Sequence, residues 1–386
     1  MRPRRLLSVA HSYCVALNRR LANEIARLER REWEVTAVAP SAFAADLGPI
    51  ALERYSGEVC RLEAIRVFGA RSPHLFLYGP RLRALMGERW DLIHCWEEPY
   101  VLAGWQVAAW SPTSIPMVFF TDQNSPKRYP PPFGWIEKYC VRRSSGWIAA
   151  GATVAKALLP RAGYAARPHR VIPHGVDLES FRPDSHARTE IRARLEWSAD
   201  GPPVVGFLGR FVPEKGVGLL TAILDNVKSP WRALLVGGGA MEPELRRWAR
   251  AYPDRVRIVT GVRHDRVPAY LNAMDLLCAP SQTTRRWREQ FGRMLIEAFA
   301  CGVPIVASDS GEIPHVVGEA GVIVAEGDRN GWAAAIGELL ENPARRAELA
   351  KLGLERAPEF SWPMVARRHV EFFNQILDGG SHRAPA

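Results

Sequence analysis

Two glutamates stand eight positions apart in the segment EQFGRMLIE, which runs from Glu289 to Glu297. The run after Gly292 favours a helix, and Gly302 followed by Pro304 is a typical helix end. The first backbone N–H groups of a helix have no partners within it, so its N-terminus attracts anions. Glu297 would lie about 8 Å further along the axis, where its carboxylate can accept paired hydrogen bonds. The spacing suits a ligand with phosphates at the helix tip and hydroxyl groups alongside; the alternative is an amphipathic helix with two surface glutamates.

A second segment, GRFVPEKG from Gly209 to Gly216, carries two cations between glycines. It follows the apolar stretch Val204–Leu208 and precedes a helical pattern, which predicts a strand, a loop and a helix. The glycines permit a tight turn, while Arg210 and Lys215 offer positive charge to a diphosphate. A departing diphosphate needs that charge at neutral pH. The alternative is an ordinary connection with two surface cations.

Together with the sequence ACGVPIVAS after the second glutamate, these segments resemble the retaining glycosyltransferases of family 4, also described as glycosyl transferases group 1. The resemblance covers nearly the whole chain and implies the GT-B fold with a nucleotide-diphosphate sugar as donor. It further implies that Glu289 holds the sugar hydroxyls, Glu297 the ribose, and the backbone amides of residues 291–293 the diphosphate. Carried over by motif, the donor-binding residues are Gly209, Arg210, Lys215, Val262, Arg263, Glu289, Phe291, Gly292, Arg293 and Glu297, with Arg210, Lys215 and Glu289 as the catalytic ones.

The acceptor side is expected at strand ends in the N-terminal half, because ligands of doubly wound sheets bind there. The candidates are His11, Tyr13, Asn18, Glu97 and Gln123. His11 and Tyr13 follow the first strand, where family members often carry two glycines, and Glu97 begins a pair of carboxylates that could hold acceptor hydroxyls. Many relatives place a histidine where Gln123 or Asn124 stands, so we expect no histidine base at this strand end. For each residue the alternative is a solvated strand end.

Apolar stretches alternate with helical ones in both halves, which predicts an α/β protein with two Rossmann-like, doubly wound parallel sheets facing a cleft. The expected strands are Leu6–Ala10, Val35–Ala39, Ala64–Phe68, Leu92–Cys95, Met117–Thr121, Trp147–Ala150, Val204–Leu208, Ala233–Val236, Val256–Val259, Leu276–Ala279, Ile305–Ala307 and Val322–Ala325. The expected helices are Leu17–Arg31, Gly218–Val227, Glu242–Ala251, Val267–Met274, Gly292–Ala300, Gly331–Glu341, Ala344–Arg356 and Met364–Leu377.

A chain of 386 residues is expected to hold two domains. We place an acceptor-side domain at residues 1–180 and a nucleotide-sugar-binding domain at 181–360. The stretch Phe181–Pro203 is polar and is interpreted as the approach to the second domain. By resemblance, a helix over 361–378 crosses back to the N-terminal domain, and residues 379–386 are expected to form a disordered tail.

Composition is that of an ordinary soluble protein, with 47% apolar and 24% charged residues. No apolar run is long enough to span a membrane, and the six cysteines form no metal-ligand pattern. We therefore expect reduced cysteines, no metal, no cofactor beyond the nucleotide-sugar co-substrate, and a cytoplasmic location.

The net charge of +10 is uneven, with 24 Lys/Arg against 16 Asp/Glu in residues 1–180. This excess suggests an acidic partner, and no nucleic-acid motif accompanies it. We expect peripheral attachment to an anionic membrane on its inner face, through the arginines around the first helix. Those arginines are Arg19, Arg20, Arg27, Arg30 and Arg31. The alternative is a solvated basic surface with no specific partner.

The expected reaction moves a sugar from a nucleotide diphosphate to an acceptor hydroxyl with retention of configuration, in the synthesis of a polysaccharide, glycolipid or other glycoconjugate. The acceptor would be a sugar or a lipid-linked sugar. Two alternatives stay open: a GT-B nucleotide-sugar epimerase or hydrolase, and a non-catalytic protein that binds nucleotide sugar as an assembly partner.

Overall fold

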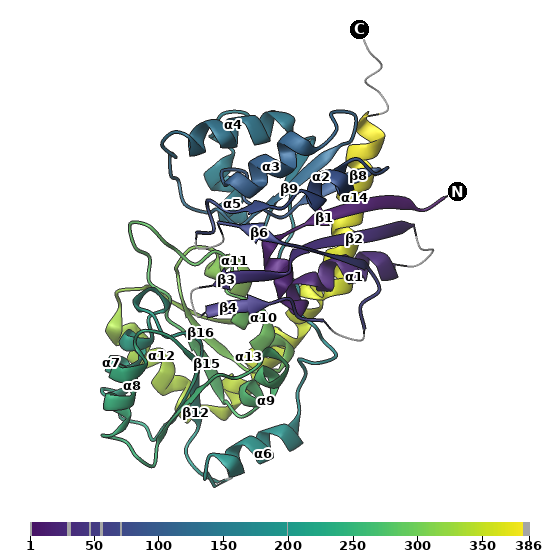
Figure 1. The fold of residues 1–386 in the computed structure, drawn as a ribbon. Coiled ribbons are helices and arrows are strands. Elements are labelled where there is room, and N and C mark those ends of the chain that lie inside the picture. Colours follow the sequence, from purple (N-terminus) through teal and green to yellow (C-terminus); the bar gives the residue numbers. More distant parts are fainter. Residues whose placement is uncertain are drawn as a thin grey trace. The chain divides into compact units, whose positions relative to one another are not determined.

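The computed structural model describes residues 2–28, 32–45, 48–54, 57–69, 72–198 and 200–380. The chain forms two compact units, each built on a parallel sheet (Figure 1). The first unit contains the residues up to His174 together with those from Trp362 onward, and the second unit runs from Gly175 to Ser361. The N-terminal unit is therefore completed by the far end of the chain.

The sheet of the first unit has seven parallel strands in the order β11-β10-β9-β8-β1-β2-β5. Its strands are β1 (Arg4–Val9), β2 (Trp33–Pro40), β5 (Arg61–Ile65), β8 (Leu92–Cys95), β9 (Met117–Thr121), β10 (Gly146–Ala149) and β11 (His169–Val171). Two small antiparallel pairs flank it: β3 (Ala42–Ala45) with β4 (Gly48–Ala51), and β6 (Val67–Phe68) with β7 (Leu77–Tyr78). Strands β9, β8 and β1 are neighbours, so their carboxyl ends lie side by side.

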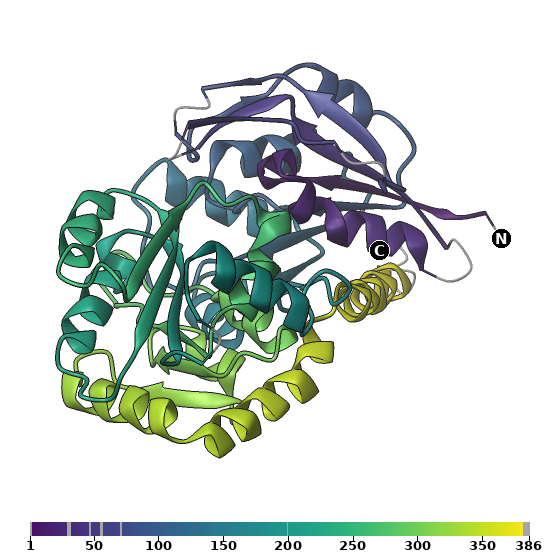
Figure 2. The same cartoon turned by 90° about the horizontal axis from the view of Figure 1, so that it is seen from below.

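Helices cover both faces of this sheet. They are α1 (Arg20–Arg27), α2 (Arg81–Met86), α3 (Leu102–Trp110), α4 (Phe133–Arg143), α5 (Ala152–Leu158) and α14 (Trp362–Gly380). Helix α14 lies beside α1, as Figure 2 shows. Their apolar side chains, including Ile25, Phe372 and Phe373, form one buried cluster with the strands. Helices α2 to α5 belong to a second cluster on the other face of the sheet.

The sheet of the second unit has six parallel strands in the order β14-β13-β12-β15-β16-β17. They are β12 (Val204–Arg210), β13 (Arg232–Gly238), β14 (Val256–Thr260), β15 (Leu276–Ala279), β16 (Ile305–Ser308) and β17 (Gly321–Val324). The helices are α6 (Ser185–Arg194), α7 (Val217–Leu224), α8 (Glu242–Ala249), α9 (Val267–Asn272), α10 (Arg293–Ala300), α11 (Ile313–Val317), α12 (Arg329–Glu341) and α13 (Pro343–Arg356).

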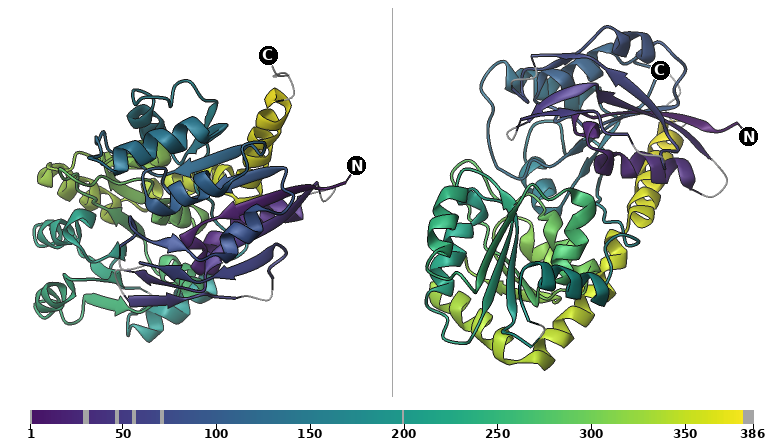
Figure 3. Two further views of the ribbon diagram at one scale, coloured as in Figure 1. Left: turned by 45° about the horizontal axis from the view of Figure 1, so that its top comes forward. Right: turned by 60° about the horizontal axis from the view of Figure 1, so that its bottom comes forward.

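In the second unit, as in the first, helices lie on both faces of the sheet, as the teal and green ribbons in Figure 3 show. One buried cluster joins α7, α8 and α12 to the strands, and another joins α9, α10 and α11 to them. The strands are apolar on both sides for this reason. Eleven of the twelve predicted strands are present within two residues of their expected bounds, whereas the predicted strand Ala64–Phe68 is divided between β5 and β6, which belong to different sheets. The two parallel-sheet α/β units confirm the expected fold class.

One helix was not predicted, and the bounds of two expected elements are wrong. The polar stretch 181–203 contains helix α6, whose N-cap Asp184 accepts a hydrogen bond from the Ala187 N–H. The helix expected from Leu17 begins as a 3-10 turn over Ala16–Arg19, and α1 starts only at Arg20. Helix α14 continues to Gly380, two residues into the expected tail, while residues 381–386 lie outside the described part.

Candidate active site

The loop GRFVPEKG lies at the carboxyl end of β12, beside the carboxyl end of β15. Gly216 has φ +70°, and a β-carbon there would come within 1.8 Å of the Pro280 carbonyl oxygen. Only glycine fits this turn, which closes the loop onto the end of the neighbouring strand. The turn brings Lys215 to Glu289, with 2.6 Å between the lysine Nζ and the carboxylate Oε2.

Glu289 is buried and held by several groups. Its carboxylate accepts a hydrogen bond from the Ser281 hydroxyl at 2.7 Å in addition to the Lys215 ion pair. The Lys215 ammonium also lies 5.0 Å from the ring centre of Trp287, a cation–π distance. Arg210 stands at the strand end, about two-fifths exposed, with its guanidinium 3.9 Å from Glu214. Both predicted cations therefore lie at the same sheet edge as Glu289.

The segment SDSGE after β16 packs directly on the Glu289 backbone. The Glu312 N–H donates to the Glu289 carbonyl at 3.0 Å, and the Glu289 N–H donates to the Ser310 hydroxyl at 3.4 Å. Gly311 has φ +56°, and a β-carbon there would meet the Glu289 carbonyl oxygen at 1.9 Å. This segment fixes where Glu289 lies.

Helix α10 begins immediately after Gly292, which has φ +84°. The Phe291 side chain is buried against Phe360, so only its backbone can face a ligand. One turn into the helix, Glu297 is nearly buried, and its Oε1 lies 3.0 Å from the Nε2 of His264. Sequence reasoning missed His264. It stands next to the segment Val262-Arg263 that was selected, and its ring is about one-third exposed.

The two residues selected at the end of β14 behave differently. Val262 packs against the apolar cluster beneath α10. Arg263 is 83% exposed and forms an ion pair with Asp265 at 3.0 Å, and this hydrogen-bonded guanidinium lowers the pKa of Asp265.

In the first unit, the carboxyl ends of β1 and β8 bring His11 to Glu97. The His11 Nδ1 lies 2.6 Å from Glu97 Oε2, and the Tyr78 hydroxyl donates to Glu97 Oε1 at 2.6 Å. Burial alone would lower the pKa of His11, but the Glu97 carboxylate attracts the imidazolium and raises the pKa above 6.5. The His11 ring is one-third exposed while Glu97 is buried. The pair places a partly exposed imidazole, backed by a buried carboxylate, at this strand end.

Tyr13 does not belong to this group. Its side chain is fully buried, with its hydroxyl 2.7 Å from the Ser8 hydroxyl, and burial raises its pKa. The selection of Tyr13 as an acceptor-side residue is wrong, because its ring turns beneath the sheet end rather than out of it. Asn18 is half-buried and donates to the Ser12 carbonyl at 2.9 Å.

The end of β9 contains an imidazole that we did not expect. Gln123 is buried, and its amide hydrogen-bonds the Tyr129 hydroxyl. Beside it, the Nε2 of His174 lies 2.7 Å from Asp122 Oδ1. We expected no histidine at this strand end, and this expectation is wrong. His174, which lies 52 positions from Asp122 along the chain, contacts it in the folded structure.

Glu98 completes this group of polar side chains. It accepts hydrogen bonds from the Thr121 hydroxyl at 2.6 Å and from the Asp122 N–H at 2.8 Å. Burial and the neighbouring Asp122 carboxylate raise the pKa of Glu98 to about 8. Near neutral pH, this carboxyl therefore holds a proton in much of the population.

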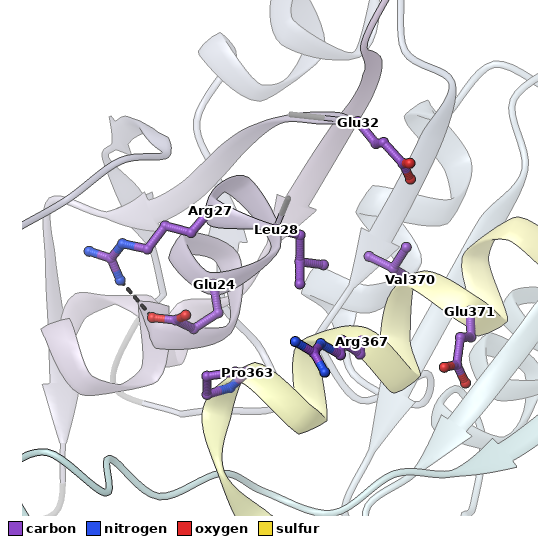
Figure 4. A pocket seen from close by; sticks show the side chains of 8 residues that line it. All are labelled: Glu24, Arg27, Leu28, Glu32, Pro363, Arg367, Val370 and Glu371. Atoms are coloured by element: carbon purple, nitrogen blue, oxygen red, sulfur yellow. Dashed lines mark hydrogen bonds and ion pairs between the residues drawn. The ribbon is translucent and has the colours of Figure 1, made fainter. Parts of the chain in front are cut away.

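Two of the five arginines expected to form a basic face around the first helix are paired with carboxylates, and Arg20 is partly buried. Arg19 is completely buried and pairs with Glu58. Arg27 pairs with Glu24 at 2.6 Å beside a cavity of about 560 Å³ between α1 and α14 (Figure 4). That cavity carries both signs of charge, and its lining residues are Glu24, Arg27, Leu28, Glu32, Pro363, Arg367, Val370 and Glu371. Arg30 and Arg31 lie outside the described residues.

Within the described residues, no three His, Cys, Asp or Glu side chains are grouped to hold a metal ion. In the same ranges, no helix has both the length and the apolar character needed to cross a bilayer. All six cysteines are buried, and none of them forms a disulfide.

Both halves of the chain match families of sugar-transferring enzymes. Residues 17–180 match the family described as Glycosyltransferase Family 4, and residues 202–342 match Glycosyl transferases group 1. D-inositol 3-phosphate glycosyltransferase of Xylanimonas cellulosilytica is 30% identical over 340 residues, which are 83% of this chain and 76% of that protein. GDP-mannose-dependent alpha-(1-6)-phosphatidylinositol monomannoside mannosyltransferase of Mycolicibacterium smegmatis is 35% identical over 213 residues, 53% of this chain and 55% of that protein.

Solved structures share the fold along the whole chain. Sucrose-phosphate synthase from Thermosynechococcus elongatus superposes with a TM-score of 0.75 at 24% identity, covering 97% of this chain and 100% of that one. Anabaena HepE in complex with UDP-glucose superposes with a TM-score of 0.72 at 20% identity, covering 96% of this chain and 99% of that one. These neighbours show that the fold is GT-B. With family matches in both halves and a relative aligned over most of its length, the chain belongs to glycosyltransferase family 4.

Proposed function

We propose that this glycosyltransferase moves a sugar from a nucleotide-diphosphate sugar to an acceptor hydroxyl with retention of configuration. The observation that carries the donor assignment is the ion pair between Lys215 and Glu289, with Arg210 at the same sheet edge and the start of α10 close in sequence. Arg210 and Lys215 supply positive charge that suits a diphosphate, while Glu289 and Glu297 supply acceptors for hydroxyl groups.

The reaction follows a front-face course. The acceptor hydroxyl attacks the anomeric carbon from the side of the departing diphosphate, the bond to the diphosphate oxygen breaks, and that oxygen takes the acceptor's proton. Arg210 and Lys215 stabilise the negative charge that develops on the diphosphate, together with the backbone amides at the start of α10. Glu289 binds the sugar hydroxyls, and Glu297 binds the ribose.

The ion pair gives Glu289 a second role. A lysine side chain is flexible, and holding its ammonium at 2.6 Å from a buried carboxylate positions it before the donor arrives. The Ser281 hydroxyl donates to the same carboxylate oxygen and fixes its position further, and a carboxylate held in this way can accept hydrogen bonds from sugar hydroxyls. We therefore assign Glu289 to both sugar binding and positioning of Lys215.

For the acceptor we propose a sugar or lipid-linked sugar used in glycoconjugate synthesis at an anionic membrane surface. The name of the M. smegmatis relative specifies GDP-mannose and a phosphatidylinositol mannoside, which supports a lipid-linked acceptor. The polar groups at the ends of β1, β8 and β9 support acceptor binding in the first unit: His11 with Glu97, Glu98, and Asp122 with His174.

A direct test incubates the purified protein with a panel of GDP- and UDP-sugars, with and without phosphatidylinositol and its mannosides. We expect turnover that needs an acceptor and a product with the donor's anomeric configuration, read by NMR. Release of free sugar without any acceptor would indicate a hydrolase. Interconversion of nucleotide sugars would indicate an epimerase, and binding without turnover would indicate a non-catalytic protein. An inverted product would contradict the front-face course.

Replacement of Lys215 tests the diphosphate assignment. We expect Lys215→Ala to weaken binding of the nucleoside diphosphate by about 1.5–3 kcal/mol, the range for a hydrogen bond to a charged group. The variant also leaves the Glu289 carboxylate buried without its cation, which should lower the melting temperature. Arg210→Ala is the matched control, because that side chain is far more exposed. It should lose affinity with little change in stability, and unchanged affinity in both variants by calorimetry would refute the assignment.

A further inference from the structure

The basic excess of the first unit is concentrated in one segment. Residues 123–171 contain nine Lys/Arg and a single acidic residue, Glu137, whereas residues 1–122 contain fifteen Lys/Arg and thirteen Asp/Glu. Glu137 is itself buried, and it pairs with Arg161 at 2.9 Å and accepts from the Tyr164 hydroxyl. The outward charge of this segment is therefore almost entirely positive.

Exposed aromatic side chains lie in the same segment. Trp135 on α4 is 66% exposed and Tyr139, one turn further along, is 38% exposed. Tryptophan and tyrosine combine an apolar ring with a polar tip, and they prefer the interface between lipid headgroups and acyl chains. A tryptophan this exposed is unusual on a surface that faces only water.

A cavity of about 630 Å³ is lined in part by Trp135. Its charged and aromatic lining comes from the loop before α4, from α4 and from α5: Lys127, Arg128, Tyr129, Trp135, Glu137, Lys138, Lys156 and Arg161. Within the described residues, Arg128, Lys138 and Lys156 form no ion pair. Cations contributed by the loop before α4, by α4 and by α5 suit a phosphate group, and Trp135 in the same lining suits the lipid to which that phosphate belongs.

We propose that this surface, formed by residues 126–139 and Lys156, docks the enzyme on an anionic bilayer, with phospholipid headgroups in the cavity and Trp135 in the interface. The inference rests on the membrane attachment proposed above and relocates it from α1 to α4. The cavity between α1 and α14 carries three carboxylates and two guanidinium groups and offers no net attraction to anionic lipid. A nucleic-acid strand would require a series of stacking aromatics along a groove. In residues 123–171 as described, Trp135 is the one aromatic more than half exposed.

Charge reversal tests the surface. Wild-type enzyme should sediment with vesicles of phosphatidylcholine containing phosphatidylglycerol, not with phosphatidylcholine alone, and salt should weaken binding. Lys138→Glu combined with Lys156→Glu should reduce the partition coefficient by about thirtyfold or more, since each basic contact contributes about fivefold. The control Lys228→Glu combined with Arg329→Glu changes net charge equally at two exposed positions of the second unit. It should reduce partitioning far less.

A fluorophore reports insertion at Trp135. Because all six native cysteines are buried, Trp135→Cys can be labelled selectively, as can the control Leu354→Cys on α13, where the native side chain is 39% exposed. We expect an emission blue shift with anionic vesicles for the label at 135 only. If both charge-reversal variants bind anionic vesicles equally, or if the label at position 135 shows no blue shift, the assignment of this surface is refuted. Membrane attachment through another surface would then still stand. Failure of wild-type enzyme to bind any vesicle overturns attachment itself, and the donor assay remains an independent test of sugar transfer.

Discussion

At the scale of single residues, Glu289 and Glu297 are distinguished by their partners. Glu289 neutralises the Lys215 ammonium, whereas Glu297 lies against the His264 ring. Loss of the negative charge at each position should therefore change the site in opposite ways. Without its carboxylate partner, Lys215 offers a full positive charge to a diphosphate, while no cation is released when Glu297 is neutralised.

We expect Glu289→Gln to retain or strengthen binding of free nucleoside diphosphate but to lower turnover by tenfold or more, because a sugar contact and the position of Lys215 are both lost. Glu297→Gln should weaken free nucleotide and nucleotide sugar alike, by about 1–2 kcal/mol. Calorimetry with both ligands separates the two outcomes. Equal loss of nucleotide affinity in both variants would show that the roles are not divided in this way.

Glu98 should make stability depend on pH. Its pKa of about 8 in the folded protein lies above the ordinary 4.5, so the folded state holds the proton more tightly than the unfolded state. The contribution of Glu98 to the free energy of unfolding is therefore complete below pH 4.5. It is lost as pH rises toward 8, by at most about 1.4 kcal/mol per pH unit. Glu98→Gln keeps an acceptor for the Asp122 N–H and should lose less stability across that interval. Parallel melting curves for both proteins between pH 5 and 8 would contradict this.

The residues that sequence could identify are those that lie close together within one motif. Glu289, Gly292 and Glu297 occupy one continuous segment, so a local pattern predicts them together. His174 lies 52 positions from Asp122, and no local pattern can reveal that pair. The error at Tyr13 has a similar origin, because position after a strand does not determine whether a ring turns outward or, as here, toward Ser8.

At the scale of elements, the start of α10 depends on a left-handed glycine. A β-carbon at Gly292 would lie 2.8 Å from Leu295 Cδ1, and φ +84° is strained for any other residue. We expect Gly292→Ala to cost about 1–3 kcal/mol of stability and to weaken diphosphate binding, because the helix start must shift. Gly337→Ala in α12 is the control, since its β-carbon meets nothing nearer than 3.9 Å. It should stabilise by up to about 1 kcal/mol, and equal effects of the two substitutions would contradict the geometric argument.

Elements with a strong apolar period were predicted well, and those without one were not. Strands β8, β9 and β15 begin and end where the apolar runs do. Helix α6 was missed because its sequence, SHARTEIRAR, is largely polar and only Ile191 and Arg192 are buried. Strand β11 was missed because all three of its residues are exposed at the sheet edge, where burial imposes no apolar pattern.

At the scale of the whole molecule, the first unit is assembled from two distant parts of the chain. The side chains of Trp362, Val365, Phe372 and Phe373 are buried in the cluster that α14 shares with α1 and the sheet. Burial of four such side chains contributes on the order of 10 kcal/mol, which is comparable to the whole stability of a domain. The second unit, from Gly175 to Ser361, has two apolar clusters composed of its own residues.

The two units should therefore differ when they are produced separately. A fragment of residues 175–361 should melt cooperatively and bind nucleoside diphosphate, because its core and the residues from Gly209 to Glu297 are all present. A fragment of residues 1–174 should aggregate, since without α14 one face of its sheet exposes a large apolar surface. The matched control joins residues 362–380 to residues 1–174 through a flexible linker, and this should restore a soluble, cooperatively melting protein. A fragment 1–174 that folds without the helix would show that α14 contributes far less than its burial indicates.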